Sequence, residues 1–405
     1  FELIEVRPTS ESEKNAPEVE WTKTFGKERS SELARAVHQT SDGGYILVGW
    51  SKKAGISDVY LVKTDSSGNL EWENKYGTEE NGERGFSVQQ TSDGGYIVAG
   101  VWGVMEKDEG LEDIGEVNSS VYLIKTDSNG NIEWEKTYGT KSEGRAVQET
   151  FDGGYVVVGY ITSETGNQEY YLIKTDSNGN IEWEKTIGTK YKDLVRSVQQ
   201  TSDGGYIVVG EAETGKGGLR ADGKPRPTLD TYIVKTDPNG NVKWDKLIGE
   251  ETGDERGYYV QQTSDGGYII GGTVDPSGGN EDEADFYLLR LNPSGDVEWQ
   301  KALGIDGIRE WSYVVDVAPD GGYVLAGETQ IGERGPNADL NVYIIRTDSS
   351  GNILWAKEVI GQTGPGLNDW ARGVEFTSDG GVIAAGMTTF ASGNKDVFLV
   401  KLRPE

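Results

Sequence analysis

The sequence contains no cysteine, one histidine and two methionines among its 405 residues. The absence of cysteine excludes disulfides, thiolate metal sites and a thiol nucleophile. Because His38 is the sole histidine, a zinc site built from several imidazoles is excluded as well. The segment VHQT around His38 corresponds to VQQT elsewhere in the chain. We therefore interpret His38 as a polar position of a repeat, and we assign no catalytic residue.

Long apolar runs are also missing. No stretch of about 18 apolar residues is present, so no transmembrane helix is expected. The segment that begins at Phe1 has neither the charged nor the apolar region of a signal peptide. Basic residues are few, since 39 Lys and Arg stand against 68 Asp and Glu, for a net charge of −29. Such a surface repels a phosphate backbone, so nucleic acid is not expected as a partner.

Glycine is plentiful, and it marks an internal repeat. The step Asp-Gly-Gly occurs seven times, 51 to 62 residues apart, at Asp42, Asp93, Asp152, Asp203, Asp265, Asp320 and Asp379. A tryptophan-centred segment accompanies each step, at Trp21, Trp72, Trp134, Trp183, Trp244, Trp299 and Trp355. Repetition at this period indicates one array of repeats in place of several independent domains. We expect these seven tryptophans to pack between neighbouring repeats.

Each repeat predicts four short strands, a to d, with period-2 patterning. In the fourth repeat they cover 195–201, 206–210, 231–236 and 241–249. Ser-Asp-Gly-Gly joins strands a and b, and Asp-Ser-Asn-Gly-Asn or a variant joins c and d. Both segments are typical of tight hairpin turns. The basic residue of strand c, such as Lys63, is expected to form ion pairs or hydrogen bonds between blades.

The last repeat lacks strand d, whereas an extra strand d around Trp21 precedes the first repeat. This offset predicts a ring in which the first strand completes the last sheet. The fold class we predict is all-β: a seven-bladed β-propeller of four-stranded antiparallel blades, closed by the N-terminal strand. Residues 18–405 form this single domain. Apart from one candidate short strand at Glu2 to Val6, residues 1–17 lack sustained periodicity and are expected to be an N-terminal tail or linker.

The segments TSDGGYIVVG and KTDSNGNIEW resemble the β-propeller repeats of secreted and surface-attached bacterial and archaeal proteins. This resemblance covers about residues 19–403. It implies an extracellular or cell-surface location, and it brings no characterised catalytic residues with it.

A candidate ligand site lies on the face that carries the b-to-c and d-to-a loops, because almost all variation in repeat length falls there. Strand a lines the axis of a propeller. Two residues before its central valine stand Arg35, Arg145, Arg196 and Arg372, with Phe86, Tyr258 and Tyr313 in the other three blades. This ring is suited to bind a carboxylate or phosphate. Alternatively, its arginines stack between blades and pair with nearby acids.

Four tryptophans lie outside the repeat pattern, near the variable-face ends of their strands, at Trp50, Trp102, Trp311 and Trp370. Ring closure makes their blades neighbours, which predicts one continuous arc. Exposed indoles in such an arc suit stacking on sugar rings or anchoring a protein partner. The alternative is that each indole covers its own loop.

Two acidic loops provide candidate metal ligands. No organic cofactor is implied, and the one candidate ion is Ca²⁺, which prefers carboxylate oxygens. The candidate ligands are Asp108, Glu109, Glu112, Asp113, Glu281, Asp282 and Glu283.

Taken together, these features favour a non-catalytic extracellular or cell-surface binding or adhesion propeller. Its partner would be a glycan or a surface protein, bound by a propeller that is monomeric within a larger surface assembly. One alternative is a polysaccharide hydrolase or lyase acting on the same face. Another is a structural spacer of a cell-surface layer.

Overall fold

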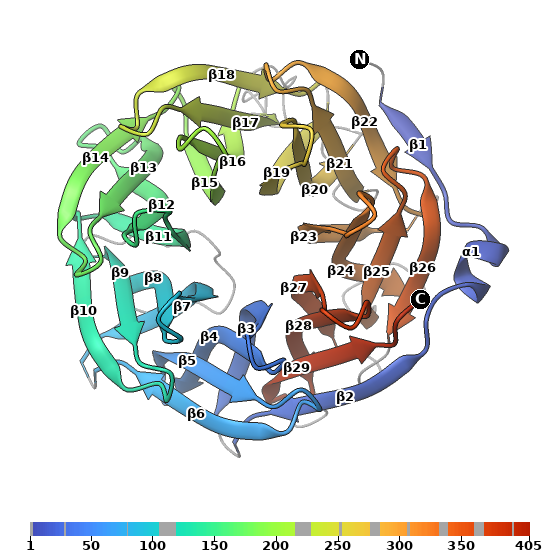
Figure 1. Ribbon diagram of the computed structural model, residues 1–405, viewed down its shortest axis with the longest axis horizontal. Helices are drawn as coiled ribbons and strands as arrows, with labels where there is room; N and C mark the ends of the chain where they lie inside the picture. The colour runs from blue at the N-terminus through green and yellow to red at the C-terminus, as the bar shows by residue number, and fades with distance from the viewer. Residues whose placement is uncertain are drawn as a thin grey trace, which may run out of the picture.

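The computed structural model describes residues 3–27, 30–78, 80–104, 119–214, 228–250, 253–275, 284–305, 308–331, 339–359, 368–390 and 393–405. Seven sheets surround a central axis, and in each of them four antiparallel strands follow one another from the axis outward (Figure 1). The predicted seven-bladed β-propeller is therefore confirmed. The only helix in the described ranges, α1 (Ser10–Lys14), has five residues, so none of the described helical structure is long enough to cross a membrane.

The strands of the first four blades follow in chain order from the axis outward. Blade 1 contains β3 (Ser31–Gln39), β4 (Tyr45–Lys53), β5 (Ile56–Thr64) and β6 (Leu70–Tyr76). Blade 2 contains β7 (Gly82–Gln90), β8 (Tyr96–Val104), β9 (Ser120–Thr126) and β10 (Ile132–Tyr138). Blade 3 contains β11 (Ser142–Glu149), β12 (Tyr155–Thr162), β13 (Gln168–Thr175) and β14 (Ile181–Ile187). Blade 4 contains β15 (Asp193–Gln200), β16 (Tyr206–Glu213), β17 (Leu229–Thr236) and β18 (Val242–Ile248).

The remaining three blades include the strands contributed by the N-terminal segment. Blade 5 contains β19 (Asp254–Gln262), β20 (Tyr268–Asp275), β21 (Asp285–Leu291) and β22 (Val297–Leu303), with β1 (Ile4–Val6) outside β22. Blade 6 contains β23 (Glu310–Val317), β24 (Tyr323–Ile331), β25 (Asp339–Thr347) and β26 (Ile353–Val359). Blade 7 contains β27 (Asp369–Phe376), β28 (Val382–Thr389), β29 (Lys395–Leu402) and β2 (Val19–Phe25).

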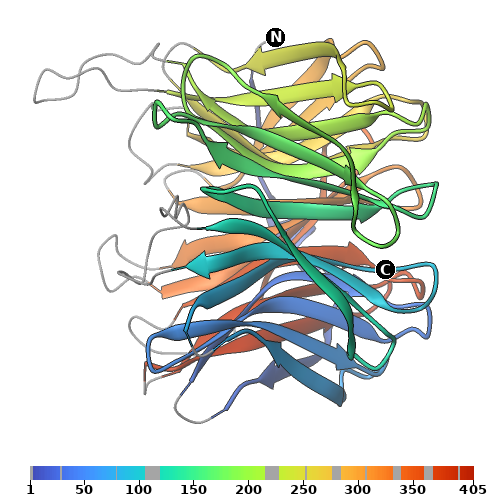
Figure 2. The same ribbon diagram turned by 90° about the vertical axis from the view of Figure 1, so that its left-hand side faces the viewer.

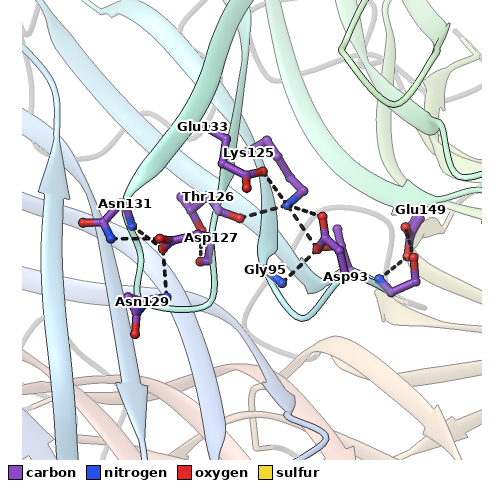
Figure 3. Close-up of polar contacts among 11 residues, drawn as sticks. Asp93, Gly95, Lys125, Thr126, Asp127, Asn129, Asn131, Glu133 and Glu149 are labelled. Carbon is purple, nitrogen blue, oxygen red and sulfur yellow. Dashed lines mark hydrogen bonds and ion pairs between the residues drawn. The ribbon is translucent and has the colours of Figure 1, made fainter.

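Both repeated turns are held by their own aspartates, as blade 2 shows (Figure 3). Asp93 Oδ1 accepts from Gly95 N at 2.9 Å, and Asp127 Oδ1 accepts from the backbone N–H of Asn131 at 2.8 Å. The Nζ of Lys125 lies 2.9 Å from Asp93 Oδ2 and 3.0 Å from Glu133 Oε2. All these groups belong to one blade. The expectation that the strand c cations pair between blades is wrong for these contacts, because the ammonium points back to the a–b turn of its own sheet.

The repeat tryptophans pack between blades, as predicted. Trp72 of β6 meets Tyr96 of β8 edge to face, with ring centroids 5.8 Å apart. The equivalent pairs, 5.7 to 6.2 Å apart, are Trp21–Tyr45, Trp134–Tyr155, Trp183–Tyr206, Trp244–Tyr268 and Trp299–Tyr323. Blade 7 has Val382 in place of tyrosine, and Trp355 packs in the same core cluster. The Trp355 indole N–H donates to Glu405 Oε1 at 2.7 Å.

The ring closes through the N-terminal segment. Strand β2 pairs antiparallel with β29, from Val19↔Leu402 to Phe25↔Val397, and completes blade 7. Within the predicted tail, β1 pairs in parallel with β22, and Arg7 Nη1 lies 2.8 Å from Asp285 Oδ2. Figure 1 shows β1 and α1 along the outside of blades 5 and 6. The part of residues 1–17 that is described is therefore attached to the ring.

Alternation of strand direction divides the connections between two faces. The a–b and c–d turns lie together at one face, on the right in Figure 2, which we call the turn face. The b–c and d–a connections belong to the opposite face, which we call the loop face.

Candidate functional site

A β-bulge interrupts the innermost strand of every blade at the same place. In blade 1, Ala34 pairs with Gly49 and Ala36 pairs with Val48, so Arg35 is the additional residue. The additional residues of the other blades are Phe86, Arg145, Arg196, Tyr258, Tyr313 and Arg372. These are the seven residues of the predicted ring. A bulge re-aims a side chain, and here all seven line one cavity on the axis, of about 160 Å³, which we call the channel.

Aromatic rings hold the arginines of the first three blades. The guanidinium of Arg35 lies over Trp50 at 4.9 Å from the ring centroid, and Arg84 lies over the same indole at 5.1 Å. Arg35 is also 5.9 Å from the ring of Phe86, over which Arg145 lies at 4.6 Å. Such contacts contribute about 0.5–2 kcal/mol each, more where water is excluded. The result is an alternating stack of cations and rings along one side of the channel.

A second stack follows the other side. Arg196 lies 5.3 Å from the ring of Tyr258, whose centroid is 5.7 Å from that of Tyr313. Arg372 lies 3.4 Å from the Tyr313 ring and 5.2 Å from that of Trp370. These stacks join neighbouring blades.

Arg145 and Arg196 of the ring also form ion pairs at the wall. Arg145 Nη2 lies 2.9 Å from Glu143 Oε1, and Arg196 Nη2 lies 2.5 Å from Glu211 Oε1. The alternative stated above, in which ring arginines stack between blades and pair with nearby acids, therefore holds for Arg145 and Arg196.

Above the ring, toward the loop face, lies a larger cavity of about 450 Å³, which we call the mouth. Its lining comes from blades 6, 7, 1, 2 and 3, and includes Trp50 and Trp370. Arg35, Phe86, Tyr313 and Arg372 line both the mouth and the channel. The mouth therefore has the bulged ring as its floor.

None of the four non-repeat tryptophans is fully exposed. Trp50 is 8% exposed, and Trp102, Trp311 and Trp370 are half-buried. Trp102 packs against the hydrophobic core shared by blades 1 and 2. Trp311 has the guanidinium groups of Arg256 and Arg309 over its ring at 5.1 and 5.0 Å. Guanidinium groups lie over the rings of Trp50, Trp311 and Trp370. These three indoles therefore help to hold arginine side chains in place.

The site is positively charged within an acidic protein. Six basic and three acidic side chains line the mouth. Of the acids, Glu32 Oε1 lies 3.2 Å from Lys75 Nζ, and Glu143 pairs with Arg145. The channel below is lined by four arginines and His38, and its described lining contains no acid. Basic side chains therefore outnumber acidic ones around this region, although the whole chain carries a charge of −29.

A belt of hydrogen bonds surrounds the turn-face end of the channel. In four blades a glutamine three positions after the bulge accepts a backbone N–H from the next blade, at 2.5 to 3.3 Å: Gln89, Gln148, Gln199 and Gln261. In blades 6 and 7, Asp316 and Glu375 accept the equivalent bonds at 2.8 and 2.6 Å. In blade 1 the position is His38, whose Nδ1 lies 3.6 Å from Glu375 Oε2.

Sequence reasoning treated His38 as an ordinary repeat position and missed its neighbours. Aligning the seven inner strands reveals that Asp316, Glu375 and His38 replace glutamine in three consecutive blades. Burial lowers the pKa of His38, but the hydrogen bond and charge of Glu375 and the charge of Asp316 outweigh it, so the pKa is raised. Burial, together with the charge of Glu375, raises the pKa of Asp316 to about 6. This side of the belt therefore holds two neighbouring groups whose pKa values are both raised.

The predicted calcium ligands Asp108, Glu109, Glu112, Asp113, Glu281, Asp282 and Glu283 lie outside the described residues. Within the described ranges, no group of three or more acidic or histidine side chains has the arrangement of a metal site.

No protein-family model and no curated protein matches the sequence. Among solved structures, a polysaccharide lyase described as an ulvan lyase matches with 9% identity and a TM-score of 0.56, over 95% of this chain and 96% of that one. A protein of unknown function from Dyadobacter fermentans matches with 11% identity and a TM-score of 0.54, over 96% of this chain and all of the other. At these identities the likeness shows the propeller fold.

Proposed function

We propose that this protein is a non-catalytic binding propeller that takes a glycan in the mouth on the loop face. The observation that carries the proposal is the mouth itself: a cavity of about 450 Å³ above a floor of arginines and aromatic rings. Its volume falls within the range of about 300–1,000 Å³ typical of small-ligand sites, and its mixture of rings and fixed polar groups is typical of them.

The place of action that we propose is outside the cell or on its surface. The support is the resemblance of the repeats to those of secreted and surface-attached proteins. Immunolabelling of intact and permeabilised source cells tests this. Labelling of intact cells is expected, and labelling that requires permeabilisation would contradict the proposal.

A glycan array with two matched variants tests the binding function. Leu33 is half-buried on the wall of the mouth, so Leu33→Trp fills it. Ser66→Trp places the same indole on an exposed turn at the opposite face. We expect Leu33→Trp to lose the binding shown by the unmodified protein while Ser66→Trp keeps it, with all melting temperatures within a few degrees. Equal binding by both variants would place the site elsewhere, and an array without any bound glycan would favour a structural spacer.

A polysaccharide hydrolase or lyase is the second candidate, because Asp316, Glu375 and His38 break the repeat pattern in the belt at the turn-face end of the channel, and the pKa values of His38 and Asp316 are raised. Any glycan bound on the array should therefore also be incubated with the protein. Release of reducing ends, or of products that absorb as unsaturated sugars, would favour the enzyme over the binding module.

A further inference from the structure

The mouth contains buried hydrogen-bond donors that lack acceptors. Among the described residues, the indole N–H of Trp370 and the Nε–H of Arg309 are buried without an acceptor, and both side chains line the mouth. The indole N–H of Trp311, beside Arg309, is in the same condition. A buried donor without an acceptor is unfavourable, because the group has lost its hydrogen bonds to water. A ligand rich in oxygen acceptors relieves this cost.

The charge of the mouth selects among such ligands. Its basic lining consists of Arg35, Lys52, Arg84, Arg309, Arg372 and Lys395. Two of its three acids, Glu32 and Glu143, already lie beside Lys75 and Arg145. The excess of positive charge therefore favours an anionic ligand over a neutral one.

The arginines of the floor are held in position before any ligand arrives. Arg35 is stacked on Trp50, and Arg372 is stacked on Tyr313. A guanidinium stacked by its face presents its N–H donors edge-on, in the fork that matches a carboxylate or other oxyanion. Because the stack has already restricted these side chains, less conformational entropy is lost on binding.

The acidic exterior limits the size of the anion. A long polyanion that crosses the loop face meets a protein with a net charge of −29, whereas a single acidic group entering the mouth meets the arginines. The channel beneath, about 160 Å³ and lined by four arginines, is continuous with this floor.

We propose that the ligand is a short acidic saccharide, whose carboxylate or sulfate group enters the mouth and binds at Arg35 and Arg372. This inference rests on the proposed glycan-binding function and names the chemical class of its ligand.

Calorimetric titration with defined probes tests the class. The probes are a galacturonate trisaccharide, a neutral galactose trisaccharide of the same length, a sulfated disaccharide and a glutamate tripeptide. We expect one or both acidic saccharides to bind at least 10-fold more tightly than the neutral one, and we expect their affinity to fall as salt is raised from 50 to 500 mM because exposed charges are screened.

Two variants of Leu33 that differ by one negative charge test whether the ligand binds in the mouth. Leu33→Glu adds a negative charge beside the floor, and Leu33→Gln adds a neutral group of the same size at a position without an ion pair. We expect Leu33→Glu to weaken the acidic saccharide at least 10-fold relative to Leu33→Gln. Equal affinity of the two variants would overturn the inference.

The remaining outcomes separate the inference from the proposed function. If the neutral trisaccharide binds as tightly as the acidic ones, glycan binding stands and the acidic class is wrong. If the glutamate tripeptide binds and neither acidic saccharide does, the partner is an acidic peptide and the saccharide class is wrong. If no saccharide binds here and none binds on the array, the proposed glycan function fails with it.

Discussion

His38 and Glu375 face each other where blade 1 meets blade 7, with 3.6 Å between the imidazole Nδ1 and the carboxylate Oε2. Glu375 Oε2 also accepts the backbone N–H of Gln39, so the carboxylate is shared between the belt of hydrogen bonds and the imidazole. The contact between blades 7 and 1 therefore brings two titratable side chains, Glu375 and His38, into the belt of hydrogen bonds.

Because His38 is the only histidine, proton NMR of its imidazole reports this junction without assignment. We expect a single titration curve with a midpoint above the usual 6.5, since the carboxylates raise the pKa of His38. Glu375→Gln should shift the midpoint downward, because it removes the charge and keeps the acceptor oxygen. A midpoint at or below 6.5 in the unmodified protein would contradict the described contact.

Buried acids at the loop-face ends of the inner strands should make the protein less stable at alkaline pH. Burial raises the pKa of Glu83 to about 7, that of Asp193 to about 6, and those of Glu255 and Glu310 to about 8. In each case the folded state binds the proton more tightly than the unfolded state, so stability falls as pH rises through these values. We expect the melting temperature to decrease between pH 5.5 and 8.5.

A matched pair of variants isolates one of these groups. Glu310 is fully buried beside Asp285, and Glu164 is exposed in a turn. Glu310→Gln should make the decrease in melting temperature from pH 5.5 to 8.5 smaller, whereas Glu164→Gln should leave it unchanged. Identical pH profiles for the two variants would contradict the raised pKa of Glu310.

At acid pH the turn aspartates should set the limit of stability. Burial alone raises the pKa of Asp93, but hydrogen bonds from Thr91 and Lys125 outweigh it and lower the pKa to about 2. The stabilisation from such a group is present above the unfolded pKa of about 4 and is lost as pH falls toward 2. Asp93→Asn should therefore cost stability at pH 6 and little at pH 2, as measured by urea unfolding at the two values.

Two truncations test ring closure. Removing residues 1–26 takes away β2 and leaves the edge of β29 unpaired, so we expect a large loss of melting temperature together with aggregation. Removing residues 1–17 takes away β1, α1, the Arg7–Asp285 ion pair and the packing of Leu3, Val6 and Ala16 against the core, but it leaves β2 in place, so we expect a decrease of a few degrees. Equal melting temperatures for the two truncations would contradict closure by β2.

Alanine substitutions at two glycines with positive φ compare the cost of backbone strain alone with the cost of strain plus disturbed packing between blades. Gly166 has φ +85°, and a Cβ there would meet nothing within 4 Å. Gly179 has φ +72°, and a Cβ there would lie 2.9 Å from the Trp134 ring. Urea unfolding should give a cost of about 1 kcal/mol for Gly166→Ala, from strain alone, and about 3 kcal/mol for Gly179→Ala, which must also displace the tryptophan. Similar costs would show that Trp134 does not depend on this turn.

The fold could be predicted from the sequence because the turn and strand patterns that specify it are local. The Asp-Gly-Gly and Asn-Gly turns fix hairpins, and the alternating strands between them can be read directly from the chain. The strand d segment around Trp21, placed before the first repeat, indicated closure by β2, and the pairing of Val19 with Leu402 confirms it. The attachment of β1 to β22 was not predicted, because a three-residue parallel pairing carries little pattern of its own.

The site was predictable only in outline. The ring of Arg35 and its equivalents was visible from repeat alignment, but the stacks of rings and guanidinium groups were not. The sequence left open whether the four additional tryptophans form an exposed arc or each cover their own loop, because sequence position gives the end of a strand and does not give the burial of a side chain there. Trp50 at 8% exposure beneath Arg35 and Arg84 shows the difference.

The sequence by itself determined the number of blades and their turns, since the spacing of the repeats and the turn motifs are local signals, and the strand d segment placed before the first repeat indicated how blade 7 is completed. Only the tertiary structure decided which partners each of the axial side chains contacts. His38 and Glu375 are 337 positions apart in the chain, and closing the ring brings them together. The bulge that turns Arg35 inward arises from a register between strands, and a register is a property of the paired sheet that neither strand specifies alone.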